Sequence, residues 1–175
     1  AQVHMGNTVA VWGVGGVGAH LVQLSKLAGA VPVIAVDLND AVLERAKRLG
    51  ADYAFRSDDP DLMKKIEDIT DGRMVDIAFD AVGIQPTLRA CVESLDINGK
   101  AVSIGLSPQN IDAGTFLEFN LKKKQLLGHL GYKRQDIARL ADMLSYGRLD
   151  LTESISKIIP LTAVSYTHLR AHETL

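Results

Sequence analysis

The most informative segment of this 175-residue sequence is Gly13-Val14-Gly15-Gly16-Val17-Gly18. It follows the short apolar run at residues 8–12 and opens a stretch of helical periodicity, which places it between a strand and a helix. Gly13 permits a tight turn, Gly15 lets the backbone approach a ligand closely, and Gly18 allows the helix to pack against the strand. The free N–H groups at the start of such a helix favour an anion, so the segment predicts a phosphate-binding loop.

A carboxylate lies at the end of the next predicted strand. Asp37 ends the apolar run at residues 32–37, at a distance from the glycine loop where it can accept hydrogen bonds from the hydroxyls of an adenosine ribose. A plain tight turn and a helix-capping Asp are the alternatives, and the combination of loop, context and spacing favours a dinucleotide. Leu38 and the two residues after it offer no arginine for a 2′-phosphate, so the sequence predicts NAD(H) over NADP(H).

Strands and helices alternate along the rest of the chain. Strands are predicted at residues 8–12, 32–37, 75–80 and 101–104, and their nearly continuous apolar character is typical of a parallel sheet covered on both faces. Helical stripes are formed by Val17, Leu21, Leu24 and Ala28; by Val42, Ala46 and Leu49; by Leu62, Ile66 and Ile69 after an N-cap at Asp59; by Leu88, Val92 and Leu95 after Pro86; and by Ile137, Leu140 and Leu144. This order predicts an α/β fold with a doubly wound parallel sheet, the Rossmann fold, in three layers α/β/α.

Composition and charge exclude several classes of protein. The formal net charge of -2 gives no basic surface for nucleic acid or for an anionic membrane. No apolar run is long enough to span a bilayer and no signal peptide is recognisable, so we expect a cytoplasmic protein. Cys91 is the single cysteine, so it can form no internal disulfide and is interpreted as a small buried hydrophobic residue.

With these residues in view, the chain resembles the cofactor domain of the medium-chain dehydrogenase/reductase family, and the zinc-type alcohol dehydrogenases in particular. The resemblance covers about residues 6–161. Beyond the glycine loop and its strand, it rests on Val36-Asp37-Leu38-Asn39, Leu49-Gly50-Ala51-Asp52, Thr70-Asp71-Gly72, Phe79-Asp80-Ala81-Val82-Gly83 and Asn98-Gly99-Lys100-Ala101-Val102. Met74 is a departure, because the family often has a second glycine there, and this could alter the turn before the following strand.

The resemblance implies a site and a partner domain. NAD would be held by Gly13, Gly15, Gly16, Val17, Gly18, Asp37, Leu38, Val82 and Gly105, with Gly105 and its neighbours Ile104 and Leu106 lining the nicotinamide. The family's catalytic zinc and proton relay belong to another domain, so this chain is expected to contain no catalytic residue and no metal ligand. The intact protein would transfer a hydride between nicotinamide and an alcohol or carbonyl substrate, and this chain alone would be inactive. A homodimer or homotetramer is implied, paired through an edge strand within residues 120–130.

Two other functions stay open. The first is a zinc-free quinone or enoyl reductase of the same family, although Trp12-Gly13 before the loop is more similar to the zinc type, and Asp37 argues against the NADPH that those reductases use. The second is a nucleotide-sensing module without catalysis, or a methyltransferase that uses the same loop for a different adenosine ligand. Titration with NADH, NADPH and S-adenosylmethionine separates these functions.

Both ends of the sequence are interpreted as artificial. Residues 1–163 are expected to be an NAD-binding domain truncated at both ends, and residues 164–175 resemble an in-frame translation of a sequencing-library adapter. His168 and His172 have the spacing of metal ligands but fall in that tail, so we predict no metal there. Scattered histidines at positions 4, 20 and 129 are expected to be packed or surface residues, and Lys122-Lys123-Lys124 is expected to be a solvated edge.

Overall fold

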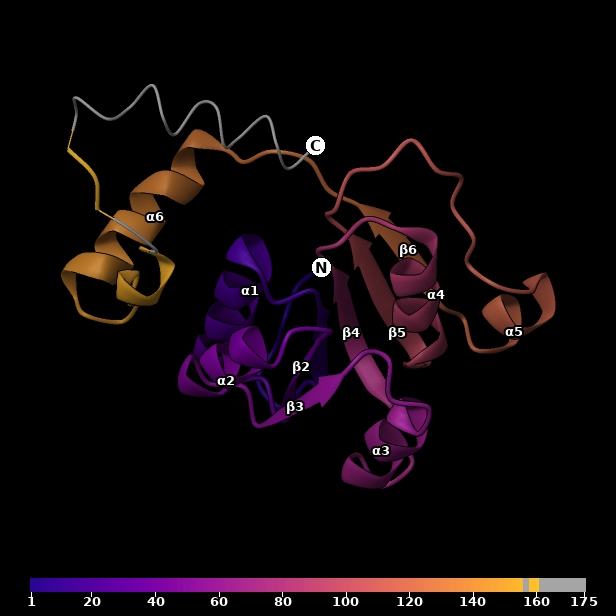
Figure 1. The fold of residues 1–175 in the computed structure, drawn as a ribbon. Helices are drawn as coiled ribbons and strands as arrows, with labels where there is room; N and C mark the ends of the chain where they lie inside the picture. The colour runs from indigo at the N-terminus through magenta and orange to yellow at the C-terminus, as the bar shows by residue number, and fades with distance from the viewer. Residues whose placement is uncertain (156–157, 161–175) are drawn as a thin grey trace.

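A single parallel sheet forms the centre of the computed structural model, which describes residues 1–155 and 158–160 (Figure 1). Its six strands, in the order β3-β2-β1-β4-β5-β6, are all parallel to their neighbours. They are β1 (Val9–Trp12), β2 (Val33–Asp37), β3 (Tyr53–Arg56), β4 (Val75–Asp80), β5 (Leu95–Ser103) and β6 (Gln125–Gly128). The order runs outward in both directions from β1, which confirms the doubly wound arrangement.

Helices connect the strands and cover the sheet on both sides. They are α1 (Gly16–Leu27), α2 (Asp40–Arg48), α3 (Leu62–Ile69), α4 (Gln85–Glu93), α5 (Phe116–Leu121) and α6 (Arg134–Ser145), followed by a 3-10 turn at Thr152–Ser154. None of the helices in the described part of the chain is long and apolar enough to cross a membrane. The tail at residues 164–175, with His168 and His172, lies outside the described residues, as does the boundary expected at residue 163.

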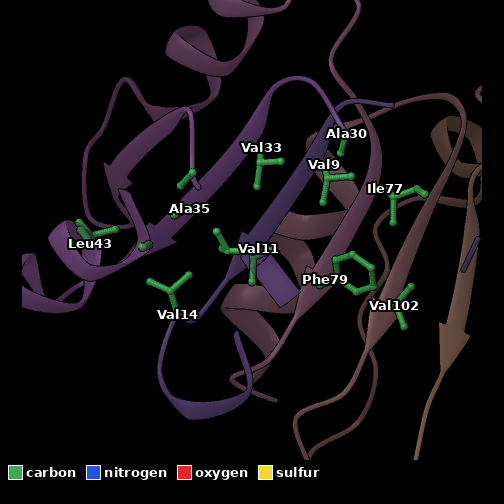
Figure 2. Packing of buried hydrophobic residues seen from close by; sticks show 13 residues of the cluster. Val9, Val11, Val14, Ala30, Val33, Ala35, Leu43, Ile77, Phe79 and Val102 are labelled. Atoms are coloured by element: carbon green, nitrogen blue, oxygen red, sulfur yellow. The ribbon is translucent and has the colours of Figure 1, made fainter. Parts of the chain in front are cut away.

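Two buried clusters lie on opposite faces of the sheet. Alternate strand residues such as Val9 and Val11 pack with Leu43 of α2 and with Val22 of α1 on one face (Figure 2). The residues between them pack against α3 and α4 on the other face; this second cluster includes Ala10, Trp12, Ile34, Val36, Ile66, Cys91 and Val92. The three-layer α/β/α fold is therefore confirmed, and Cys91 is buried as predicted.

The buried face of α1 differs from the predicted one. Val17 is 56% exposed, whereas Ala19, Val22 and Ser25, on the other side of the helix, are buried. The reason is the close contact of Gly18 with the loop before it, which turns the face with small residues onto the sheet and leaves Val17 at the carboxyl edge. The predicted stripe was therefore wrong at Val17 and Ala28, which are exposed, whereas Leu21 is partly buried and packs against the core.

Other boundaries also differ from the sequence prediction. α3 begins at Leu62, after Pro60, and the Asp59 carboxylate accepts from the Asp61 N–H in the preceding turn instead of capping the helix. Leu95 begins β5 and does not belong to α4. Met74 has φ 68, so a residue with a side chain takes the left-handed conformation that glycine would adopt more easily.

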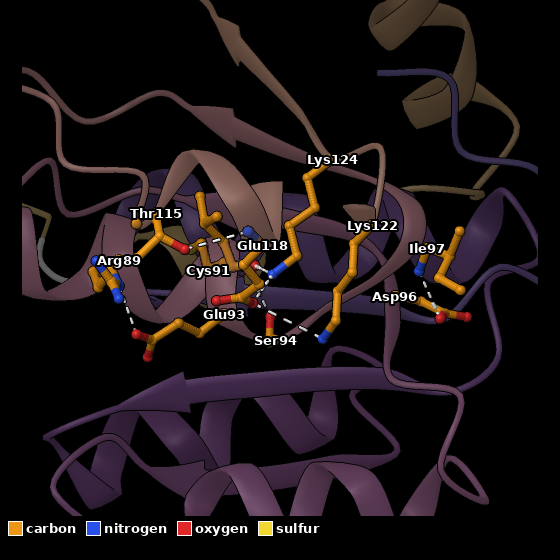
Figure 3. Close-up of polar contacts among 12 residues, drawn as sticks. Arg89, Cys91, Glu93, Ser94, Asp96, Ile97, Thr115, Glu118, Lys122 and Lys124 are labelled. Atoms are coloured by element: carbon orange, nitrogen blue, oxygen red, sulfur yellow. Dashed lines mark hydrogen bonds and ion pairs between the residues drawn. The ribbon is translucent and has the colours of Figure 1, made fainter. Parts of the chain in front are cut away.

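The basic run before β6 is not solvated throughout. The side chain of Lys124 is 1% exposed, and its Nζ donates to the Val92 carbonyl at 2.7 Å and to Glu118 Oε1 at 2.8 Å (Figure 3). This pair joins α5, α4 and the start of β6, so the prediction of a solvated edge was wrong for Lys124. β6 itself lies at the edge of the sheet, as expected for the run at residues 120–130.

Candidate functional site

The candidate site lies at the carboxyl ends of β1 and β4. The chain leaves these neighbouring strands towards opposite sides of the sheet, since α1 covers one face and α4 the other. In open α/β sheets, a crevice for ligands forms at this point. The glycine loop follows β1 and leads into α1 at Gly16, so the first N–H groups of that helix point into the crevice region.

The glycines of the loop fall into two groups. Gly13 has φ 82, and a Cβ there would meet Val82 Cγ2 at 2.5 Å, so the loops after β1 and β4 are in contact. Gly18 would place a Cβ at 1.8 Å from the Gly13 carbonyl oxygen. At Gly15 and Gly16, by contrast, a Cβ would meet no heavy atom within 4 Å. Packing therefore requires glycine at positions 13 and 18, while Gly15 and Gly16 face open space.

Asp37 connects the end of β2 to this loop. Its Oδ2 accepts from the Val14 N–H at 2.9 Å, and its Oδ1 accepts from the Asn39 N–H at 2.9 Å. The residue is half-buried. An ionised carboxylate has about four acceptor positions, so Asp37 keeps capacity for the hydroxyls of a bound ribose.

Two arginines that are distant in sequence lie near this carboxylate. Arg45 of α2 donates from Nη2 to the carbonyl oxygens of Val14 and Gly15, both at 2.8 Å. Arg56 of β3 is the register partner of Asp37 on the neighbouring strand. The residues beside Asp37 in sequence contain no arginine, as stated above, but the fold supplies two. Sequence reasoning missed them because they come from later elements.

The guanidinium of Arg56 is hydrogen-bonded to two carboxylates. It makes two hydrogen bonds to Asp58, both at 2.8 Å, and one to Asp40 at 3.0 Å. These contacts, above all the hydrogen bond with Asp58, raise the pKa of Arg56 and lower the pKa of the Asp58 carboxyl. The cluster of Asp37, Asp40, Arg56 and Asp58 therefore combines three carboxylates with one guanidinium and is negative overall at neutral pH.

Apolar side chains are exposed around the same edge. Leu38 is 60%, Val82 41%, Val17 56% and Leu106 76% exposed. A cavity of about 440 Å³ opens beside the helix start, and its lining includes Val17, Leu21, Phe79, Val102, Ile104, His129 and Leu130. Exposed apolar groups that gather at one edge, next to loop N–H groups, are typical of a ligand site.

Gly105 lies in the neighbouring loop contact. A Cβ there would be 2.2 Å from the backbone nitrogen of Gly83, so the loops after β4 and β5 touch through their backbones. Gly105 lines a smaller cavity, of about 180 Å³, together with Asp80, instead of the larger cavity that includes its neighbour Ile104. The backbone contact explains why glycine is required at position 105.

Asp80 is a buried positioning group for the turn after β4. Its Oδ1 accepts from the N–H groups of Val82 and Gly83, both at 3.1 Å, and from the Thr87 hydroxyl at 3.0 Å. The residue is 1% exposed, and its Oδ2 has no hydrogen-bond partner within the described residues. Asp80 therefore holds Val82 over the glycine loop. The sequence offered only its position in a family motif as a signal.

The described residues do not provide a metal centre. No group of three or more His, Cys, Asp or Glu side chains in residues 1–155 and 158–160 could hold an ion. His20, one of the scattered histidines, contacts the Ser154 hydroxyl through Nε2 at 2.9 Å. These residues therefore do not fit a zinc ion, and no reaction step through zinc can be assigned to them.

Comparison with known proteins identifies a family that this chain matches. The family described as zinc-binding dehydrogenase matches residues 16–146. Sorbitol dehydrogenase of Bacillus subtilis is 35% identical over 109 residues, which are 62% of this chain and 31% of that protein. An alcohol dehydrogenase of Cupriavidus necator is 30% identical over 153 residues, covering 86% of this chain and 42% of that protein.

Solved structures agree with the fold. The crystal structure of benzyl alcohol dehydrogenase from Acinetobacter calcoaceticus matches with a TM-score of 0.86 and 26% identity, covering 98% of this chain and 48% of that one. The chain thus spans less than half the length of each of these three proteins.

Proposed function

The chain belongs to the zinc-binding dehydrogenase family, and from that premise we propose that it is the NAD(H)-binding part of an alcohol dehydrogenase-like oxidoreductase. One observation carries the proposal. The Asp37 carboxylate accepts from the Val14 N–H of a glycine loop that has its open side, at Gly15 and Gly16, facing the crevice beside β1 and β4. This arrangement supports the proposal, because Asp37 could accept from ribose hydroxyls while the neighbouring N–H groups, which have no acceptor among the described residues, could bind a diphosphate.

The proposed contacts follow the loop. The N–H groups of Gly15, Gly16 and Val17 would bind the diphosphate, and the start of α1 adds the positive end of the helix dipole. Asp37 would accept from the ribose hydroxyls. The exposed side chains of Leu38 and Val82 would pack against the adenine ring, because both are apolar and both adjoin the loop or the carboxylate.

NAD(H) is favoured over NADP(H) by the charges around the ribose position. Asp37, Asp40 and Asp58 outnumber Arg56, which is already bound by two of them. Arg45 is bound to the loop carbonyls. A 2′-phosphate would therefore meet net negative charge and no free guanidinium from these two arginines.

The bound nicotinamide would supply hydride chemistry, and the residues of this chain would bind and orient it. The cavity beside Val17 and Ile104 would shield its reactive face with apolar side chains. The substrate would be an alcohol or a carbonyl compound, as the names of the relatives suggest for those proteins. Zinc would belong to a further domain of the intact protein, and a homodimer or homotetramer remains part of the proposal.

Calorimetric titration of the chain with NADH, NADPH and S-adenosylmethionine tests this function. We expect NADH to bind more tightly than NADPH, and S-adenosylmethionine not to bind. Preference for NADPH would favour the zinc-free reductase, and binding of S-adenosylmethionine alone would favour the methyltransferase. No binding of any of the three by folded protein would overturn the assignment.

We also propose that the isolated chain does not oxidise NADH with aldehydes, with or without added zinc. Hydride transfer needs a substrate held close to the nicotinamide and an electrophile at its oxygen. The check is NADH absorbance over a panel of aldehydes. Zinc-dependent turnover that is lost in Gly15→Val would contradict this part of the proposal.

A further inference from the structure

Arg45 contacts the glycine loop from the side opposite the open space. One nitrogen of its guanidinium, Nη2, donates to two consecutive carbonyl oxygens, those of Val14 and Gly15, at 2.8 Å each. Its Nε is buried and has no hydrogen-bond partner within the described range. The side chain therefore extends from α2 to the loop and is half-buried there.

Because the peptide unit is planar, this contact determines which way the N–H groups of the loop point. In a trans peptide the C=O and the N–H of the same unit point in opposite directions. The carbonyl of Val14 shares a peptide unit with the N–H of Gly15, and the carbonyl of Gly15 shares one with the N–H of Gly16. Arg45 holds both carbonyls towards α2, the Gly15 carbonyl together with the Ala19 N–H of α1 at 3.2 Å, so both N–H groups are directed away from α2. Neither N–H has an acceptor among the described residues.

Asp37 fixes the preceding peptide unit in a complementary way. It accepts from the Val14 N–H, so the backbone of Val14 is held at its N–H by a carboxylate and at its C=O by a guanidinium. Hydrogen bonds with a charged partner are shorter and stronger than neutral ones. The loop is thus held before any ligand arrives, which lowers the ordering cost of binding.

We infer that Arg45 is a positioning residue for the diphosphate of the cofactor. Its guanidinium is engaged with the loop carbonyls, so it would act through the loop, by presenting the N–H groups of Gly15 and Gly16 to the anion. Its positive charge behind the loop also favours the anion. This inference rests on the proposed function, since it assumes that a dinucleotide binds at the loop.

The discriminating experiment compares ligands with and without a diphosphate. NADH, ADP-ribose and adenosine are titrated into the wild-type chain, Arg45→Met, Arg45→Lys and the control Arg48→Met. Arg48 lies on the same helix but pairs with Glu153 at 3.0 Å, away from the loop. Urea unfolding of each variant accompanies the titrations, and hydrogen exchange reports on the Val14 amide, which donates to Asp37 in the loop.

In Arg45→Met, affinity for NADH and ADP-ribose should fall about tenfold, because two charge-assisted contacts to the loop are lost. Adenosine affinity should change by less than about twofold, and the Val14 amide should exchange faster, because the loop that holds it against Asp37 is less firmly fixed. Arg45→Lys, which keeps the charge and three donors, should recover part of the affinity. Arg48→Met should bind all three ligands as the wild type does.

The alternative results distinguish a failure of the proposed function from a failure of the role proposed for Arg45. If the wild-type chain is folded and does not bind NADH, the proposed function fails. If it binds NADH and Arg45→Met binds NADH equally well, the role of Arg45 fails. An equal loss for adenosine and ADP-ribose, with a lowered unfolding midpoint, would mean that Arg45 only stabilises the fold. If Arg45→Met does not fold, folded Arg45→Lys decides the question. A loss of ADP-ribose affinity that is larger than the loss of adenosine affinity supports the role of Arg45. An unchanged ADP-ribose affinity, or an equal loss for both ligands, overturns it.

Discussion

The carbonyl oxygen of Gly13 occupies the space that a side chain at Gly18 would need, since a Cβ there would lie 1.8 Å from it. The same Cβ would also come within 2.8 Å of the Gly13 carbonyl carbon. Both contacts are with backbone, which cannot rotate away as a flexible side chain could. The first and last glycines of the loop are therefore one packing unit, which sets how closely α1 approaches β1.

Gly18→Ala should destabilise the chain by about 2–3 kcal/mol, because overpacking against fixed backbone forces the loop to shift. NADH affinity should fall as well, since the displaced loop no longer presents its N–H groups. Urea unfolding measures the first effect and calorimetry the second. Gly16→Ala is the matched control, because its Cβ would meet no heavy atom within 4 Å. An unchanged unfolding midpoint in Gly18→Ala would contradict the close packing.

Gly15→Val should separate binding from stability. In the free chain a Cβ at Gly15 meets no heavy atom within 4 Å, so the free energy of unfolding should fall only by the about 1 kcal/mol that valine costs at the N-cap of α1. With a dinucleotide bound, the new side chain would occupy the place where the diphosphate approaches the backbone, and NADH affinity should fall by more than about tenfold. Gly16→Ala adds a smaller side chain and keeps its N–H, so it should lose less affinity for NADH than Gly15→Val does. Wild-type affinity in Gly15→Val would show that the diphosphate binds elsewhere.

The central strands could be predicted from sequence because burial on both faces makes them continuously apolar. β1, β2 and β4 are of this kind. The edge strand β3 was missed, because Tyr53 and Arg56 are exposed at its ends and its apolar run is too short. The start of β5 was missed for a similar reason, since Ile97 and Asn98 in its first half are exposed.

The candidate site also has a part that the local sequence shows and a part that it does not. The glycine loop and Asp37 form a local pattern whose spacing the sequence displays directly. Arg45 and Arg56 reach the loop and the ribose position only through the packing of α2 and the register of β3, which no local pattern encodes. The burial of Lys124 was likewise hidden, because its charge predicts solvent exposure unless the partner on α5, Glu118, is known.

Glu118→Gln should lower stability most at neutral pH. The hydrogen bond from Lys124 is the main cause that lowers the pKa of the Glu118 carboxyl below its ordinary value of 4.5. A carboxyl with a lowered pKa in the folded state contributes stability above its unfolded-state pKa, and this contribution is lost as the pH falls through the folded-state pKa. The difference between wild type and variant should therefore shrink as the pH is lowered from about 7 to below about 4.

Urea unfolding at several pH values measures this difference. Glu44→Gln is a suitable control, because the carboxylate is 62% exposed and its pair with Lys47 is an ordinary surface pair. A difference for Glu118→Gln that stays constant over the whole pH range would show that the charge of Glu118 does not contribute to stability through Lys124.

Cofactor preference should respond to the charges around Asp37. Asp37→Ser combined with Leu38→Arg removes one repulsive carboxylate and adds a guanidinium that can bind a 2′-phosphate. The ratio of NADH to NADPH affinity should narrow or reverse, and adding Asp58→Asn should shift it further, because Arg56 then loses one of its two acceptors on residue 58 and a negative charge is removed. Asp68→Ser, on α3 and paired with Lys64 at 2.7 Å, is the control and should leave the ratio unchanged. Fluorescence titration with both cofactors gives the ratio. Urea unfolding shows whether stability is kept when the Val14 N–H loses the Asp37 carboxylate as its acceptor. A ratio that does not move in the double variant, in protein that is folded and still binds NADH, would show that Asp37 does not face the ribose.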